Sequence, residues 1–164
     1  MRSAQAKVLF FCGAIFTHFV AAAQKKDSVA YLKTSPLING YTLVGKGTAK
    51  HEVIEPGRGL DINSDKQEVF SLSSGTVSAC FSTDSSFILM IKTEDTFYVY
   101  NGLKELSVKK GDPVSKNMRI GTLSIDPELS AYTLNLQIWI ASNKKTRQLD
   151  PGKIIEYKDK TDKG

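Results

Sequence analysis

Histidine, cysteine and long apolar runs are all scarce in this chain, and each shortage narrows what the protein can be. Its 164 residues include only 2 histidines and 2 cysteines, so there is little material for a disulfide scaffold. No apolar run reaches the ~20 residues that a typical membrane-spanning helix needs. The net charge is a mild +5, and no basic stripe with interleaved aromatic residues occurs, which argues against nucleic acid binding.

The N-terminus has the order of a cleavable signal peptide: a basic start, an apolar run and then small residues. Two basic residues accompany the apolar run at 8–16, and residues 21–23 are all alanine. The polar residues 24–27 follow at once, which favours cleavage close to Ala23 over a buried N-terminal helix or a retained anchor. We therefore predict a secreted or periplasmic mature chain with no membrane span after cleavage.

Cysteine usage agrees with export into a bacterial envelope. Cys80 is the only cysteine after position 23, so the mature chain can form no internal disulfide. An exported protein without disulfides is more typical of a bacterial envelope than of a eukaryotic secreted scaffold. We interpret Cys80 as a small apolar residue in a strand rather than as a reactive thiol.

Short runs of strand-forming residues, bounded by turn residues, dominate the mature sequence. The runs at 87–92 and 96–100 flank Glu94-Asp95 and predict a hairpin. The run at 134–140 alternates apolar and other residues with period two, which predicts a half-buried strand. Helical periodicity is weak: residues 27–33 favour a short helix, whereas 153–155 favour a final short strand. The pattern predicts a small all-β fold, either an antiparallel sandwich or an open barrel.

Three segments together carry a resemblance to a known family. They are residues 57–62 leading to 68–77, residues 98–103 leading to 108–114 and 120–123, and residues 134–139 followed by Asp150-Pro151. In this order they resemble the lysostaphin/LytM-type zinc endopeptidase domain, a family of peptidoglycan hydrolases. The resemblance covers roughly residues 36–155. The chain is therefore predicted to divide into a signal peptide at 1–23, an N-terminal extension at 24–35, a LytM-like β domain at 36–157 and a flexible, charged tail at 158–164.

The family's histidines are replaced at every motif position. Its H-x-x-x-D motif falls on Gly57 and Asp61, its next histidine on Gly102, and its H-x-H motif on Thr133 and Asn135. A catalytic zinc needs about three protein ligands and an open position for water, which one carboxylate and an amide do not supply. The glycine and the threonine also remove groups that would stabilise the transition state or move protons. We therefore expect zinc to be absent, with Asp61 either a relic of the site or a turn-capping residue.

These replacements make a pseudo-peptidase the leading interpretation. In this family, degenerate domains regulate cell-wall amidases or form parts of envelope complexes, so the resemblance implies a binding or structural module. The partner would be an envelope protein or peptidoglycan. The predicted binding surface contains Asp61, Asn135, Gln137 and Trp139, where the tryptophan is either a groove aromatic or a core residue.

Two other functions stay open. The first is a cell-wall metallo-endopeptidase with an altered metal site, for which His51 is the only histidine of the mature chain. The second is a biotinyl/lipoyl-like carrier, because residues 108–114 and 120–121 resemble the pattern of those domains. A carrier needs a modifiable lysine at an exposed hairpin tip. Lys92 is the nearest candidate, although it lies at a strand end without flanking methionines on both sides.

Overall fold

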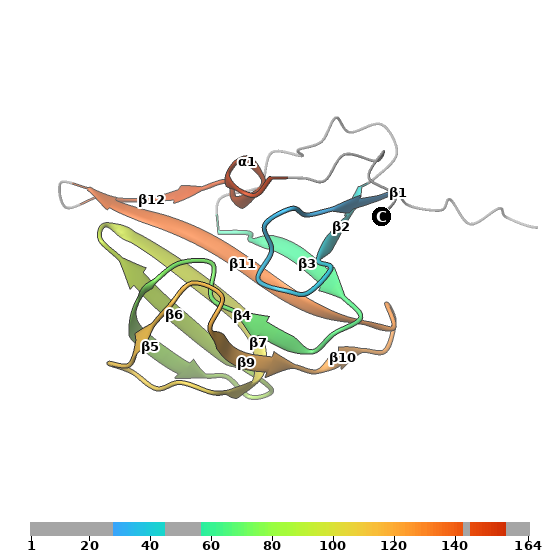
Figure 1. The fold of residues 1–164 in the computed structure, drawn as a ribbon, viewed down its shortest axis with the longest axis horizontal. Coiled ribbons are helices and arrows are strands. Elements are labelled where there is room, and N and C mark those ends of the chain that lie inside the picture. Colours follow the sequence, from blue (N-terminus) through green and yellow to red (C-terminus); the bar gives the residue numbers. More distant parts are fainter. Residues whose placement is uncertain (1–27, 45–56, 143–144, 157–164) are drawn as a thin grey trace, which may run out of the picture.

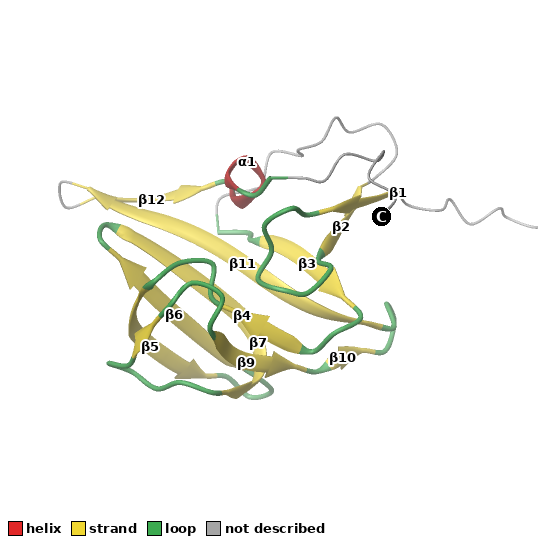
Figure 2. Ribbon diagram, in the orientation of Figure 1, coloured by secondary structure: helices red, strands yellow, loops and turns green. Residues whose placement is uncertain are grey.

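Residues 28–44, 57–142 and 145–156 are described in the computed structural model, where they form one open antiparallel sheet of twelve strands and one short helix (Figures 1 and 2). This confirms the predicted all-β class. The strands are β1 (Ser28–Tyr31), β2 (Tyr41–Val44), β3 (Leu60–Ser64), β4 (Glu68–Phe70), β5 (Gly75–Ser82), β6 (Phe87–Thr93), β7 (Thr96–Leu106), β8 (Pro113–Val114), β9 (Arg119–Leu123), β10 (Ile125–Asp126), β11 (Ala131–Ser142) and β12 (Lys145–Leu149), and the helix is α1 (Pro151–Ile154).

Strand β11 is the central element of the sheet, whose strand order is β1-β2-β3-β11-β7-β6-β5-β8. One edge of β11 pairs with β7. The other edge pairs first with β3 and then with β12, so these two strands lie end to end along it (Figure 1). The predicted hairpin at 87–100 is present as β6 and β7.

The hydrophobic core lies against one face of this sheet, which we call the inner face. Strand β11 contributes Leu134, Leu136 and Ile138, all at most 1% exposed, as the period-two pattern predicts. Strand β9 pairs with both β4 and the end of β7, and its apolar side chains join the same core. The sheet therefore bends over its own inner face, and the opposite face, the outer face, stays on the surface.

Tyr100 is the largest side chain that is fully buried in this core. Its hydroxyl accepts a hydrogen bond of 2.9 Å from the backbone N–H of Leu72. Burial raises the pKa of Tyr100 to about 12, because a phenolate would lose its hydration inside the core. The tyrosine thus ties the segment after β4 to the middle of the sheet.

Two local predictions were wrong. Residues 28–31 form strand β1 rather than part of a helix, because they pair with β2 from Ser28–Val44 to Tyr31–Tyr41. The expected strand at 153–155 is instead the helical turn α1, which begins with Pro151 after the cap Asp150. The Asp150 carboxylate accepts a hydrogen bond of 2.9 Å from Gly152 N–H, which is the usual work of a helix N-cap.

Cys80 lies in β5, is half-buried and packs against the core. Burial raises the pKa of its thiol, which disfavours the reactive thiolate. Its position therefore agrees with the interpretation as a small apolar strand residue. The predicted signal peptide, His51 and the tail at 158–164 lie outside the described residues.

Candidate functional site

The outer face of β11 carries a row of polar side chains directly behind the core residues. Thr133, Asn135, Gln137 and Trp139 alternate with the buried leucines and isoleucine, and all four are half-buried. Because side chains two positions apart share a face of a strand, the four form one continuous line. The structure thus brings together three of the predicted binding residues on a single strand.

Asp61 completes this line from the neighbouring strand. It pairs with Asn135 across β3 and β11, and the Asn135 side-chain N–H donates a 2.7 Å hydrogen bond to the Asp61 carboxylate. The carboxylate itself is exposed. Asp61 lies inside β3, so the alternative interpretation as a turn-capping residue was wrong.

The hydrogen bonds along β11 all point the same way. Trp139 Nε1 donates to the Gln137 side-chain oxygen at 3.0 Å, and Gln137 Nε2 is 3.5 Å from the Asn135 side-chain oxygen. Asn135 in turn donates to Asp61. We call this set of four residues the amide ladder. Its donors are oriented toward a single carboxylate, that of Asp61, so the four side chains form one connected network.

A fifth residue, Gln148, supports the ladder and was missed from the sequence. It lies on β12 opposite Trp139. Its side-chain oxygen accepts from Gly57 N–H at 2.6 Å, and its Nε2 donates to the Arg58 carbonyl at 3.0 Å. Nothing in the sequence near position 148 signals this role, because the contact depends on β12 pairing beside β3.

The positions that resemble the family's histidine sites do converge in space. Gly57 contacts the ladder because its carbonyl accepts from Gln137 Nε2 at 3.3 Å. A side chain at Gly102 would point toward the Thr133 carbonyl, 3.7 Å from a Cβ built there. Both glycines have positive φ angles, +88° for Gly57 and +95° for Gly102, which L side chains rarely adopt. Thr133 donates its hydroxyl to the Asn63 side chain at 2.8 Å.

Gly59 fits closely over the middle of the ladder. A Cβ on it would collide with the Asn135 side chain and would lie 2.7 Å from the Leu136 carbonyl oxygen. Only glycine therefore lets the chain pass so near to β11 at this point. This close approach holds the Asn135 side chain in place from above.

The donor set here does not fit a catalytic zinc. The structurally described residues contain no cluster of three His, Cys, Asp or Glu side chains that could hold a metal ion. At the converging positions there is one carboxylate, already accepting a hydrogen bond, together with neutral amides and glycines. Zinc sites in proteins are built from thiolates, imidazoles and carboxylates, usually with at least three such ligands.

A shallow pocket of about 390 Å³ lies beside Thr133, the outer-face residue that precedes Asn135 on β11. Its other wall is the segment Ser124–Glu128, which includes β10 and pairs with the start of β11. The Asp126 carboxylate accepts from Glu128 N–H at 2.8 Å and so fixes the turn of this segment. Residues 124–128 therefore lie along the edge of the outer face that is nearest to Thr133.

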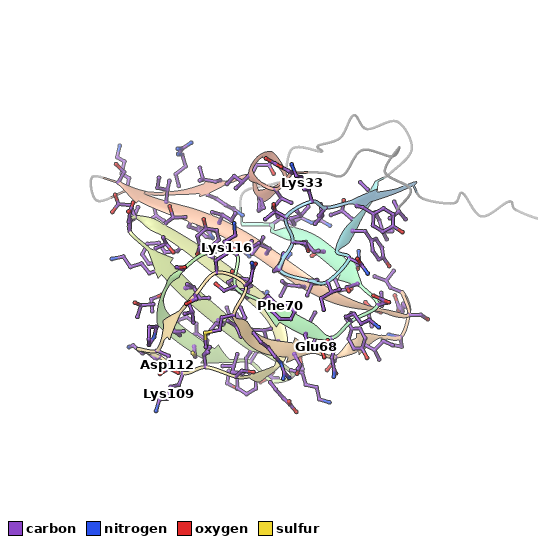
Figure 3. The ribbon with its side chains drawn as sticks, in the orientation of Figure 1. Lys33, Glu68, Phe70, Lys109, Asp112 and Lys116 are labelled. Carbon is purple, nitrogen blue, oxygen red and sulfur yellow. The ribbon has the colours of Figure 1, made fainter. Side chains whose placement is uncertain are left out.

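Positive charge is dispersed over the described surface. Figure 3 places Lys33, Lys109 and Lys116 on separate parts of the molecule. Lys33 forms an exposed ion pair of 2.9 Å with Glu156, which raises the pKa of the lysine and lowers that of the carboxyl. No helix among the described residues is long and apolar enough to cross a membrane.

Comparison with solved structures identifies the fold. No protein-family model and no curated protein matches the sequence. The catalytic domain of the prophage-encoded protein EnpA from Enterococcus faecalis, solved as a point mutant, aligns with a TM-score of 0.50 and 14% identity, covering 72% of this chain and 95% of that one. The antimicrobial peptidase lysostaphin from Staphylococcus simulans aligns with a TM-score of 0.50 and 18% identity, covering 79% of this chain and 50% of that one.

These likenesses define an all-β domain with an open antiparallel sheet. More specifically, the chain has the lysostaphin/LytM-type fold, as the sequence resemblance predicts. The match spans only half of the lysostaphin chain.

Proposed function

We propose that this chain is a catalytically inactive LytM-like domain that binds a partner in the bacterial cell envelope. The observation that carries the proposal is the 2.7 Å hydrogen bond between Asn135 and Asp61. In the resemblance, both residues occupy positions of the zinc site. Here they hold each other instead, with the Asn135 amide where an imidazole would be needed.

The chemistry of the remaining positions supports inactivity. A hydrolytic zinc lowers the pKa of its bound water to ~7 and polarises the scissile carbonyl. Gly57, Gly102 and Thr133 supply no imidazole for metal binding or proton transfer. No step of peptide hydrolysis can therefore be assigned to these side chains.

The composition of the outer face supports binding. Its side-chain amides can both donate and accept hydrogen bonds, and Trp139 is half-buried rather than sealed in the core. Aromatic residues are enriched at the centres of interfaces, and polar groups are typical of the surrounding rim. Export through the predicted signal peptide would bring this face to an envelope protein or to peptidoglycan.

The carrier alternative loses support from the position of Lys92. The tip of the β6–β7 hairpin is Glu94-Asp95, whereas Lys92 lies within β6. Its ammonium is 5.8 Å from the centre of the Phe97 ring, a cation–π contact on the sheet surface. A metallo-endopeptidase with an altered metal site remains the second candidate function. The metal content of the purified protein distinguishes it from the proposed inactive domain.

The first test measures zinc and hydrolysis together. We expect the purified mature chain to carry far less than one zinc per molecule and to leave purified peptidoglycan uncut. About one zinc per chain together with cell-wall clearing would refute the proposal. The double variant Gly57→His/Asn135→His should gain zinc affinity without hydrolysis. Its stability must be measured in parallel, because a side chain at positive φ costs about 1–2 kcal/mol.

The second test addresses binding. Tagged mature chain is used to isolate partners from envelope extract, with purified peptidoglycan tested separately. Trp139→Ala should weaken the binding found by more than ~1 kcal/mol, as loss of an anchor aromatic does. Leu43→Ala is the matched control, because Leu43 is 45% exposed and lies on β2. If Trp139→Ala folds and binds normally, the functional surface lies elsewhere.

A further inference from the structure

We infer that the outer face holds an extended, apolar segment of a partner protein, with an acidic residue at one end and a basic residue at the other. This inference rests on the proposed function and names the class of partner. It begins from the strand register, which aligns outer-face side chains from neighbouring strands into three rows. The rows are Phe81-Ile88-Asn101-Asn135-Asp61, Ala79-Met90-Val99-Gln137 and Lys92-Phe97-Trp139-Gln148.

The β5–β6–β7 side of these rows is apolar although it faces away from the core. An antiparallel sheet with one solvated face normally alternates apolar and polar residues. Strand β6 instead has apolar residues on both faces: Leu89 and Ile91 point into the core, whereas Ile88 and Met90 lie on the outer face. The outer-face members Phe81, Ile88, Met90, Phe97 and Val99, which we call the apolar strip, do not belong to the core cluster.

Exposure within the strip rises from its centre to its β5 end. Val99, which lies opposite Met90, is only 8% exposed. Phe81, at the β5 end, is 52% exposed. The exposed part of the strip is therefore Phe81, and an exposed apolar side chain beside further apolar neighbours favours an interaction site.

The other side of the rows is the amide ladder, extended by Asn101 and Gln148. The ladder amides and Gln148 are already engaged with one another, with Asp61 and with the backbone of Gly57 and Arg58. An extended segment lying along the boundary therefore directs its apolar side chains to the strip, beside this polar border. The face measures about 19 Å by 14 Å from the strand spacing and rise, enough for about five extended residues.

Charge completes the description of the occupant. Within the three rows, Lys92 is the only base and Asp61 is the only acid, and they stand at opposite corners. The face is uncharged between these two corners. It therefore complements a segment whose acidic residue lies near Lys92 and whose basic residue lies near Asp61. It complements neither a polyanion nor a polycation, because only one counter-charge of each sign is present.

The experiment selects ligands without assuming one. A display library of random linear peptides is selected on the full mature chain, and the best peptides are measured by fluorescence anisotropy. We expect an apolar centre, an acidic residue at one end and a basic residue at the other. Phe81→Lys should weaken binding about tenfold or more, and Lys92→Glu should reverse the preference for the acidic end. Leu43→Lys, an exposed apolar residue on β2, should change nothing.

Soluble fragments of purified peptidoglycan serve as the competing probe. Met90→Lys is tested too, but Phe81→Lys decides the matter if that variant fails to fold, because Phe81 is already 52% exposed. The inference is overturned if the selected peptides share no apolar centre, if Phe81→Lys binds normally, or if only peptidoglycan fragments bind. If Trp139→Ala abolishes partner binding while Phe81→Lys does not, the proposed function stands and this inference alone fails.

Discussion

The two faces of β11 differ completely although they belong to the same twelve residues. On the inner face, Leu134, Leu136 and Ile138 are at most 1% exposed and fill the core. On the outer face, Gln137 donates to the Asn135 side-chain oxygen, and Asn135 donates to Asp61. One face specifies the fold and the other specifies the chemistry. A lysostaphin/LytM-type fold can therefore persist while the residues on its outer face change.

This comparison is tested most severely by truncating neighbouring residues on opposite faces. Leu136→Ala should destabilise the protein by about 2–5 kcal/mol, because it opens a cavity in a fully packed core. Gln137→Ala should cost less than about 1.5 kcal/mol, since it removes only partly solvated hydrogen bonds. Urea denaturation measures the free energy of unfolding of each variant, and the values are comparable when the m-values are equal. Equal losses for the two variants would show that the outer face also determines the fold.

A second test uses the ionisation of the inner face. The pKa of Tyr100 is about 12 in the folded protein, whereas that of a solvent-exposed tyrosine is near 10.0. Between these values the unfolded chain binds fewer protons, so the free energy of unfolding falls as pH rises. The loss is about 2–3 kcal/mol across this window. This pH-dependent loss of unfolding free energy should be much smaller in Tyr100→Phe, which has no phenol to ionise at this position. At neutral pH, the same variant should be less stable than the original protein by about 1 kcal/mol, because it lacks the hydrogen bond to Leu72. Parallel curves for the two proteins would mean that Tyr100 is not the group responsible.

The smallest effect is expected at the exposed ion pair of Lys33 and Glu156. Glu156→Gln should lower stability slightly at low salt and not measurably at high salt, because solvent and ions screen an exposed pair. The lysine lowers the pKa of the Glu156 carboxyl, so the contribution is present near neutral pH and disappears on acidification. Thermal unfolding at two salt concentrations is the measurement. A salt-independent loss would point to a packing role instead.

The sequence predicted what depends on neighbouring residues and missed what depends on distant ones. The β6–β7 hairpin and the alternation in β11 are local patterns, and both are present. Residues 28–31 were misjudged because a short apolar stretch is ambiguous until its partner β2 is known. The turn at α1 did carry a signal, since Asp150-Pro151 is a typical helix start, but it was overlooked.

The candidate site follows the same division. Asp61, Asn135, Gln137 and Trp139 could be found because the family resemblance placed the first two and strand alternation gave the others. Gln148 could not, because it reaches Gly57 across 91 positions of sequence. The positive φ angles of Gly57 and Gly102 were equally inaccessible, since composition records a glycine but not the conformation that requires it.

The central place of β11 also has a consequence for how the chain acquires its structure. Strands β5, β6 and β7 are consecutive and can pair as soon as they exist. Strand β3 can pair with β2 on one edge, but its other edge must wait for β11, about 70 residues later, and the outer face has no ladder until β11 is in place. Pairing over such separations is slow because the loop must close before any contact compensates for it. The β3–β11 pairing, and with it the complete outer face, therefore forms later than the β5–β6–β7 meander.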